Sequence, residues 1–268
     1  MPVTARPPIE IETSPVSATL DQVADWLSLR CHENLGAEIL LRGRKSRPIA
    51  RVAIARRAGV LAGVSVLSIS GGWYLEAADP ETAVTLAEQM DNDAPKRLTT
   101  VAAVRDWVLP TVERRWKVTR HHRLLSMTAL HAVGGEGRWA AAQDIPALMQ
   151  YQTLYNAERH MTGDPNWDDF IARKQIAVLE ENGRIVAVVK RSGETARYAC
   201  IGDTFTFPEF RKQGLGKRLT AFMVERLLSE CPRVHLIVDD DNAPALALYR
   251  TLEFGEIGEC FVDYLSSY

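Results

Sequence analysis

A basic loop with two glycines is the segment of this chain best suited to chemistry. It lies between an apolar strand and an amphipathic helix, in the stretch TFTFPEFRKQGLGKRL that begins at Thr204 and ends at Leu219. Glycine lets a backbone turn tightly and approach a ligand closely. The start of the following helix offers N–H groups without helical partners and the positive end of a dipole. The stretch therefore predicts a pyrophosphate site, although a solvated basic helix cap would have the same composition.

The spacing of the glycines excludes two common phosphate motifs. A dinucleotide fingerprint would need glycine where Leu219 stands. A P-loop would need glycine in place of Arg211 and serine or threonine in place of Arg218. What remains is R-x-x-G-x-G, formed by Arg211, Gly214 and Gly216.

A second ordered element follows at residues 242–254, with the sequence NAPALALYRTLEF. Asn242 is a good N-cap for a helix. Tyr249 shares one helical face with Leu248 and Leu252, so it could be a plain core tyrosine. Together with the upstream motif, however, this element resembles the GNAT acetyltransferases, whose motifs are Q/R-x-x-G-x-G/A and N-x-x-A-x-x-L-Y-x-x-x-G-F. Glu253 replaces the usual glycine, and the resemblance covers about residues 139–268.

The resemblance implies acetyl-CoA as cosubstrate and no metal. It implies a strand that splays from its neighbour and offers backbone groups to the pantetheine arm, and a helix start whose amides hold the pyrophosphate. The cofactor-binding residues expected from the motifs are Thr204, Phe205, Thr206, Arg211, Lys212, Gln213, Gly214, Leu215, Gly216, Lys217, Arg218 and Asn242.

Catalytic roles follow from the same resemblance. Tyr249 would be the general acid that protonates the departing thiolate, since a phenol of pKa about 10 is close enough to a thiol of pKa about 8.5. The acceptor amine must lose a proton before it attacks, and the sequence leaves the base open between Asp203, Glu158 and a chain of waters. Simple strand alternation would turn Asp203 away from the side of Thr204. His121-His122 and Cys31-His32 have no partners at metal-ligand spacing.

Hydrophobic periodicity and turn residues predict an α/β protein of the α+β type with mixed, mostly antiparallel sheets. The expected helices span 17–38, 101–112, 144–160, 166–174, 214–230 and 242–252, with one more opening at Asp79-Pro80-Glu81; the expected strands span 52–55, 61–67, 73–78, 124–132, 176–179, 185–189, 196–207, 234–238 and 256–264. Residues 1–15 are expected to be an extended lead-in.

The two halves of the chain look like tandem copies. Gly59 and Gly183 are 124 positions apart, and apolar residues flank both at the same offset. We expect a domain at 1–133, a glycine linker at 134–137 and a catalytic domain at 138–268. In the first domain, the helix at the equivalent place begins with the acidic Asp79-Pro80-Glu81 rather than with glycines, and these carboxylates would repel a pyrophosphate. The first domain would therefore be a degenerate GNAT-like copy. The alternative is an independent accessory α/β domain.

Composition narrows the remaining function classes. The formal net charge is −2, and no basic stripe suggests nucleic acid or an anionic membrane as a partner. The four cysteines are scattered, which favours a cytoplasmic protein. Within these limits, the resemblance to the GNAT acetyltransferases implies transfer of an acetyl group from acetyl-CoA to a primary amine of a small molecule or peptide. The alternatives are a non-catalytic acyl-CoA sensor and a transferase of another acyl group.

Overall fold

The chain divides into two compact units. The computed structural model describes residues 6–29, 31–45, 48–90, 94–159 and 165–268. Unit 1 comprises residues 1–126 and 258–268, and unit 2 comprises residues 127–257. This division differs from the expected one in two respects, because residues 127–133 belong to unit 2 and the last eleven residues belong to unit 1.

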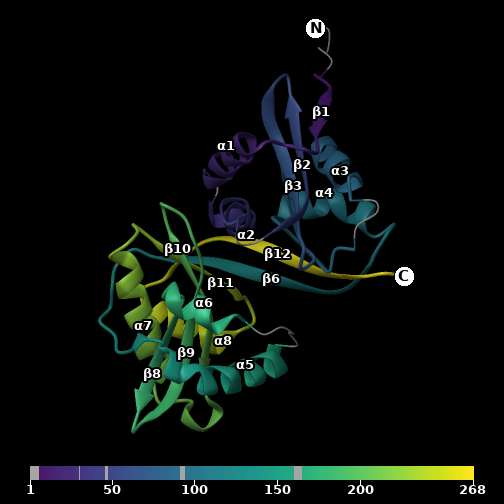
Figure 1. Cartoon of the computed structure of the whole chain (residues 1–268). Coiled ribbons are helices and arrows are strands. Elements are labelled where there is room, and N and C mark those ends of the chain that lie inside the picture. The colour runs from purple at the N-terminus through teal and green to yellow at the C-terminus, as the bar shows by residue number, and fades with distance from the viewer. Residues whose placement is uncertain (1–5, 30, 46–47, 91–93, 160–164) are drawn as a thin grey trace. The chain divides into compact units, whose positions relative to one another are not determined.

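Unit 1 is a sheet with helices on both faces (Figure 1). Its elements are β1 (Ile9–Glu12), α1 (Ser17–Ser28), α2 (Cys31–Arg42), β2 (Ile49–Arg57), β3 (Val60–Ser68), β4 (Gly72–Ala77), α3 (Pro80–Glu88), β5 (Arg97–Thr100) and α4 (Ala102–Val112). The strand order is β1-β2-β3-β4-β5-β12, in which β12 (Gly255–Ser266) contributes its last residues. β6 (Lys117–Ala129) begins in unit 1 and ends in unit 2.

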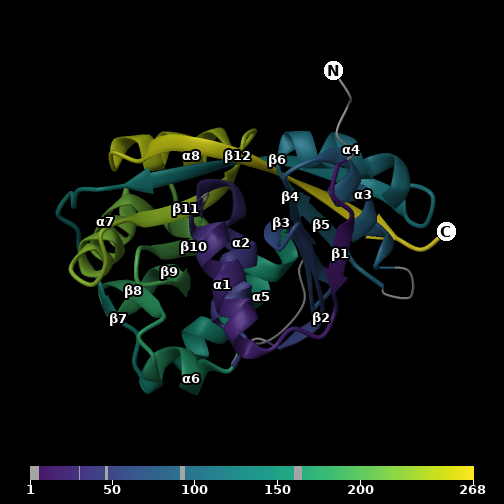
Figure 2. The same ribbon diagram turned by 90° about the horizontal axis from the view of Figure 1, so that it is seen from above.

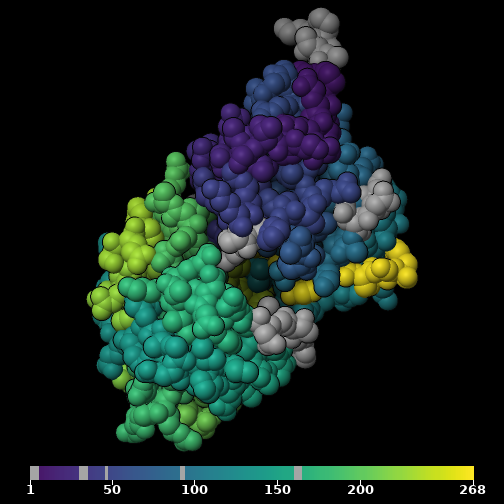
Figure 3. Space-filling view, in the orientation of Figure 1, coloured from purple at the N-terminus to yellow at the C-terminus, as the bar shows by residue number. Residues whose placement is uncertain are grey.

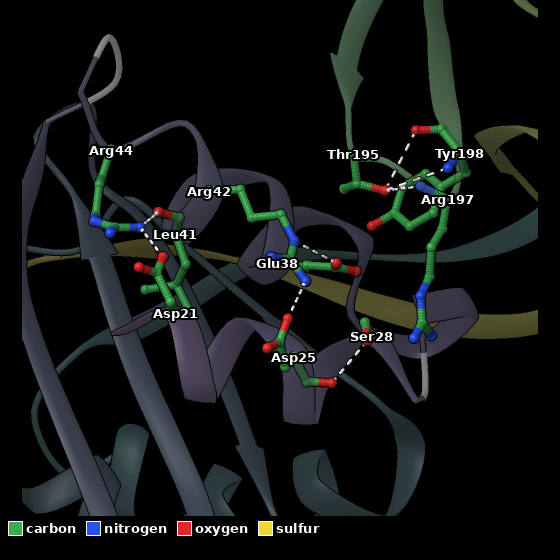
Figure 4. Close-up of polar contacts among 10 residues, drawn as sticks. All are labelled: Asp21, Asp25, Ser28, Glu38, Leu41, Arg42, Arg44, Thr195, Arg197 and Tyr198. Atoms are coloured by element: carbon green, nitrogen blue, oxygen red, sulfur yellow. Dashed lines mark hydrogen bonds and ion pairs between the residues drawn. The ribbon is translucent and has the colours of Figure 1, made fainter. Parts of the chain in front are cut away.

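Alternation along the strands of unit 1 creates two apolar layers. Ile54 and Val64 pack with α1 and α2, whereas Ala53 and Ala55 pack with α3 and α4. Arg42 joins α1 to α2, because its guanidinium pairs with Asp25 at 2.9 Å and with Glu38 at 2.7 Å (Figure 4). In the space-filling view, α1 forms part of the surface of this unit (Figure 3).

Unit 2 has the same kind of layering. Its elements are β7 (Arg138–Trp139), the 3-10 turn η1 (Ala142–Asp144), α5 (Ile145–Arg159), α6 (Trp167–Ala172), β8 (Ile176–Glu181), β9 (Arg184–Glu194), β10 (Ala199–Thr206), the 3-10 turn η2 (Pro208–Phe210), α7 (Leu215–Leu228), β11 (Val234–Asp239) and α8 (Ala243–Thr251). The strand order is β11-β10-β9-β8-β7. Figure 2 shows α5 and α6 on one side of these strands and α7 on the other.

The two units share both element order and strand directions. In each, three successive antiparallel pairs are followed by one parallel pair: β1-β2-β3-β4-β5 in unit 1 and β7-β8-β9-β10-β11 in unit 2. The registers agree at the offset of 124, since Ile54 faces Val64 and Val178 faces Val188. The hairpin bulge also falls at equivalent places, after Ala55 and after Leu179. The expected fold class is confirmed.

Several local expectations were wrong. The helix expected over 17–38 is two helices, because α1 ends at Ser28 and α2 begins at Cys31. The strand expected over 124–132 begins earlier, at Lys117, so that His121-His122 lie within β6. Residues 9–12 of the expected extended lead-in form an edge strand.

The glycine segment 134–137 is not a loose linker. A Cβ at Gly135 would lie 2.1 Å from the backbone N of Phe222, and one at Gly137 would lie 2.7 Å from Leu219. These glycines let the chain pack closely against α7.

Candidate active site

A bulge in β10 is the local feature from which the site is built. Gly202 faces Lys190 and Phe205 faces Val188, so Asp203 and Thr204 together lie opposite a single residue of β9. Asp203 takes a φ of 51°, in the left-handed region that non-glycine residues rarely adopt. A bulge of this kind re-aims side chains and ends regular alternation. The expectation that Asp203 and Thr204 point to opposite sides by simple alternation therefore does not apply.

The strand also separates from its parallel neighbour. The register between β10 and β11 covers only Ala199 and Cys200, although β10 continues to Thr206 and both strands lie wholly within the described residues. The later part of β10 thus has a backbone edge that the β11 register leaves open for pairing, and residues 204–206 lie in this part of the strand.

Tyr249 reaches this open part of β10 from α8. Its phenol Oη lies 3.5 Å from Oγ1 of Thr204, and the residue is only 8% exposed. Burial raises the pKa of Tyr249, the charge of nearby Asp203 adds to the rise, and the hydrogen bond to Thr204 opposes it. Its hydroxyl therefore holds its proton at neutral pH. Asn242 begins the same helix, and its side chain accepts a hydrogen bond from the backbone N of Ala245 at 3.2 Å.

Asp203 is held by two donors from other elements. The phenol of Tyr155 in α5 donates to Oδ1 at 2.8 Å, and the ammonium of Lys190 in β9 lies 3.2 Å from Oδ2. Lys190 in turn donates to Oε1 of Gln152 at 2.9 Å. Sequence reasoning identified Asp203 but none of its three companions. The single lysine at the end of the apolar run IVAVVK was the only signal that could have pointed to them.

The helix start that follows β10 and η2 has an open backbone. Gly214 is the N-cap of α7, its φ is 77°, and no side chain caps the helix. A Cβ at Gly214 would meet no atom within 4 Å, whereas one at Gly216 would lie 3.0 Å from Oγ1 of Thr206. The first N–H groups of a helix have no helical partner, so this end can accept an anion.

The polar and basic side chains near this helix start differ in whether they are already paired within the protein. Lys212, Gln213 and Lys217 are exposed. Arg211 donates to the backbone O of Thr206 at 3.0 Å and pairs with Glu158 at 2.6 Å. Arg218 instead pairs with Glu181 at 2.6 Å and with Glu136. Its guanidinium is therefore already matched by two carboxylates.

The remaining predicted residues have packing roles in the structure. Phe205 is 4% exposed and packs against Tyr151 and Phe207, and Leu215 is buried at 3% exposure. Their backbone groups, rather than their side chains, are what they could offer a ligand. Glu158, at the end of α5, is joined to Arg211 and not to the Asp203 group. Among the described side chains no cluster of His, Cys, Asp or Glu could hold a metal ion; the side chains of Cys31 and His32 lie outside the described part.

Comparisons with known proteins agree with this geometry. Residues 143–254 match the sequence model of the Acetyltransferase (GNAT) family. A curated relative, Acetyltransferase ECA0875 of Pectobacterium atrosepticum, is 31% identical over 101 residues, which cover 36% of this chain and 63% of that protein. This chain therefore spans less than two thirds of the relative that it matches.

Solved structures resemble nearly the whole chain. A GCN5-related N-acetyltransferase from Sphaerobacter thermophilus has a TM-score of 0.65 at 16% identity, covering 95% of this chain and 94% of its own. A tandem GNAT protein from the clavulanic acid biosynthesis pathway has a TM-score of 0.59 at 13% identity, covering 97% and 98%. At these identities the likeness is one of fold. No helix within the described residues is long and apolar enough to cross a membrane. Residues 143–254 of this chain form a domain of the acetyltransferase (GNAT) family.

Proposed function

We propose that unit 2 transfers an acetyl group from acetyl-CoA directly to a primary amine of a small molecule or peptide. The observation that carries the proposal is the buried phenol of Tyr249, which meets Thr204 beside the open part of β10. A positioned proton donor assists the expulsion of a thiolate.

The residues at the β10–α7 junction suit acetyl-CoA. Backbone groups of residues 204–206 would bind the pantetheine arm, and the amides from Gln213 to Lys217 would bind the pyrophosphate. The expected set included the amide of Arg218, which instead donates to the backbone O of Gly214 at 3.1 Å. The uncapped start of α7 supports this assignment, because it leaves those N–H groups without a side-chain acceptor. Lys212 and Lys217 are exposed beside it and add positive charge. Acetyl-CoA bound there would supply the thioester. Asn242 and Arg218 would act less directly, since both are engaged within the protein.

Tyr249 would act as the general acid. Burial raises the pKa of Tyr249, so the phenol is protonated before the thiolate forms. Donation from Oη to the departing sulfur leaves a phenolate beside the hydroxyl of Thr204, which can donate a hydrogen bond to it.

Asp203 is the carboxylate that we assign to the acceptor side. It directly precedes Thr204, whose hydroxyl the phenol of Tyr249 contacts. Glu158 is half-exposed and tied to Arg211. We therefore prefer Asp203 over Glu158 as the group that attracts the acceptor ammonium and receives its proton, directly or through water.

Unit 1 is proposed to be a degenerate copy of the same fold that does not bind acetyl-CoA. The shared registers support common ancestry of the two units. We also propose a cytoplasmic location, in keeping with the thiols of Cys231 and Cys260, which form no disulfide.

The test is release of free thiol from acetyl-CoA in the presence of a broad panel of primary amines. Calorimetry with acetyl-CoA is run on the same preparation. Amine-dependent thiol release is the expected result. Tight binding without turnover across the panel would instead favour a non-catalytic sensor. Turnover only with longer acyl-CoA donors would favour a transferase of another acyl group.

A further inference from the structure

Lys190 is a buried cation that the proposed chemistry does not yet use. It lies in β9, where the run from Ile185 to Val189 is otherwise apolar, and it is 5% exposed. Removing an ammonium from water costs several kcal/mol unless the charge is matched and its hydrogen bonds are satisfied. A charged lysine in this position must therefore be stabilised by the groups around it.

The surroundings of Lys190 match its charge closely. The ammonium Nζ lies 3.2 Å from Oδ2 of Asp203 and 2.9 Å from Oε1 of Gln152. It also lies 5.0 Å from the ring centre of Tyr151 and 5.5 Å from that of Trp167, within the range of cation–π attraction. Burial lowers the pKa of Lys190, and the carboxylate of Asp203 opposes that change. Asp203 is thus the anion that offsets the burial of this ammonium.

The other unit provides an internal comparison. At the offset of 124, the counterpart of Lys190 is Val66, which is fully buried. Val66 faces Tyr74, and the next pair in the ladder is Ser65 with Leu75, without a bulge. Where β4 has the single residue Leu75, β10 has the two residues Asp203 and Thr204. The lysine and the bulge therefore occur together in unit 2 and are both missing from the equivalent described positions of unit 1.

A strained bulge persists only where its surroundings hold it. Asp203 has a left-handed backbone at a φ of 51°, and its carboxylate is fixed from β9 by Lys190 and from α5 by Tyr155. The next residue is Thr204, which contacts Tyr249. A change in the side chain of Asp203 is therefore transmitted through one peptide unit to the partner of the proposed acid.

We propose that Lys190 is a positioning residue that fixes Asp203 in the β10 bulge and thereby sets Thr204 and Asp203 relative to Tyr249. This role rests on the proposed acetyl transfer. Lys190 itself binds neither acetyl-CoA nor the acceptor.

The experiment is a double-mutant cycle in the full chain with Lys190→Met and Asp203→Asn. Methionine keeps a side chain of similar length among the aromatic rings but removes the ammonium. Lys190→Gln, which can still donate a hydrogen bond, is the second variant and serves if the methionine variant folds poorly. Lys174→Met is the matched control, because this lysine is exposed. Each protein is measured for melting temperature, acetyl-CoA dissociation constant, and kcat and KM for an accepted amine.

We expect Lys190→Met to lower kcat by about 10- to 100-fold, as small misplacements of reacting groups do, with the acetyl-CoA dissociation constant unchanged. The glutamine variant should fall between the methionine variant and the wild type. The double variant should lose no more activity than Asp203→Asn alone, because both changes remove one function. Lys174→Met should behave as the wild type.

Three outcomes would overturn the proposal, and they lead to two distinguishable conclusions. If the wild type turns over and Lys190→Met only melts earlier, with kcat unchanged, the ion pair is structural and the positioning role is wrong. Additive losses in the double variant lead to the same conclusion. If the wild type itself releases no thiol with any amine, the proposed transfer fails and the role of Lys190 in it fails as well.

Discussion

The two strand-to-helix junctions of this chain show how one fold can keep or lose an anion site. In unit 1, β4 leads into α3, and the side chain of Asp79 accepts a hydrogen bond from the backbone N of Thr82 at 3.0 Å. Arg57 completes this cap through Asp79 at 3.2 Å and Glu81 at 2.6 Å. In unit 2, β10 leads into α7 through Gly214, and no side chain caps the helix.

Both junctions have the positive end of a helix dipole and backbone N–H groups without helical partners, although α3 has one N–H fewer because it begins with Pro80. In unit 1 a carboxylate of the protein itself accepts from them. In unit 2 they remain open to a ligand. The difference shows that such a helix start can bind a ligand only where no side chain of the protein already accepts hydrogen bonds from its N–H groups.

The strongest test of the unit 2 junction is Tyr249→Phe. This change keeps the ring and its packing against Phe254 but removes the atom that can protonate a thiolate. Loss of a positioned general acid typically lowers the rate by about 10²- to 10⁴-fold, which is about 3 to 5 kcal/mol. The acetyl-CoA dissociation constant should change little, since one hydrogen bond contributes about 1 kcal/mol. Thiol-release kinetics and calorimetry on both proteins provide the measurement. An unchanged kcat would show that Tyr249 is only a core residue.

A substitution at Gly214 tests the difference between the two junctions most directly. Gly214→Asp places a carboxylate at the N-cap position of α7, and we expect it to weaken acetyl-CoA binding by about 100-fold or more, because juxtaposed like charges cost several kcal/mol. Gly214→Asn is the matched control, since asparagine has nearly the same shape, no charge, and tolerance for positive φ.

Calorimetry of these variants also counts the sites. The wild type should bind one acetyl-CoA per chain, and Gly214→Asp should leave no site of wild-type affinity. A second, persistent site in that variant would mean that the junction in unit 1 is not closed.

The cap in unit 1 predicts an effect on stability rather than on binding. Asp79→Ala should lower the free energy of unfolding by about 1 kcal/mol, the usual value of an N-cap, and leave the acetyl-CoA dissociation constant unchanged. Burial acts to raise the pKa of Asp79, but the bonds to Thr82 and the charge of Arg57 outweigh it, so the pKa is lowered from 3.8.

That direction fixes the pH dependence of the Asp79 effect. A depressed pKa in the folded state means that the carboxylate stabilises the protein above its unfolded pKa, and that this contribution disappears as the pH falls through the folded pKa. The difference in melting temperature between wild type and Asp79→Ala should therefore be full at pH 7 and shrink below about pH 4. A difference that stays constant down to pH 2.5 would contradict the cap.

The smallest expected effect concerns Glu253, which follows α8 with a φ of 60°. Glu253→Gly removes the steric cost of a left-handed non-glycine residue and should raise the free energy of unfolding by roughly 0.5 kcal/mol, because the gain is partly offset by greater freedom of the unfolded chain. Chemical denaturation measures it, with Glu256→Gly as the control outside that conformation. Destabilisation by Glu253→Gly would show that its side chain has a role not apparent from the backbone.

Local signals in the sequence predicted most of the elements of the fold. The Asn182-Gly183 turn lies between β8 and β9, and the caps Asp79 and Asn242 begin α3 and α8. Such signals depend on a few neighbouring residues, so they can be recognised without the tertiary structure. The family motifs likewise located Gly214 and Tyr249.

What the sequence did not reveal depends on contacts between distant segments. The β10 bulge breaks strand alternation, and none of the residue types in this strand predicts the backbone geometry that forms it. The role of Lys190 could not be predicted from the sequence, because it depends on the fold bringing Asp203 and Gln152 next to its ammonium. The first half of β6 was missed because polar and basic residues dominate it, and β5 was missed because it has only four residues.

The division of β12 between the units has a consequence for the order in which the chain can fold. Residues 261–264 pair with β5, yet they are separated from it by more than 150 positions in the sequence. On a ribosome, the first unit must wait for the last segment to emerge before its sheet is complete, whereas domains usually fold in the order of synthesis. Closing so long a loop also slows the search for the native pairing. Deletion of residues 258–268 should therefore expose the edge of β5 in unit 1, far in sequence from the cut.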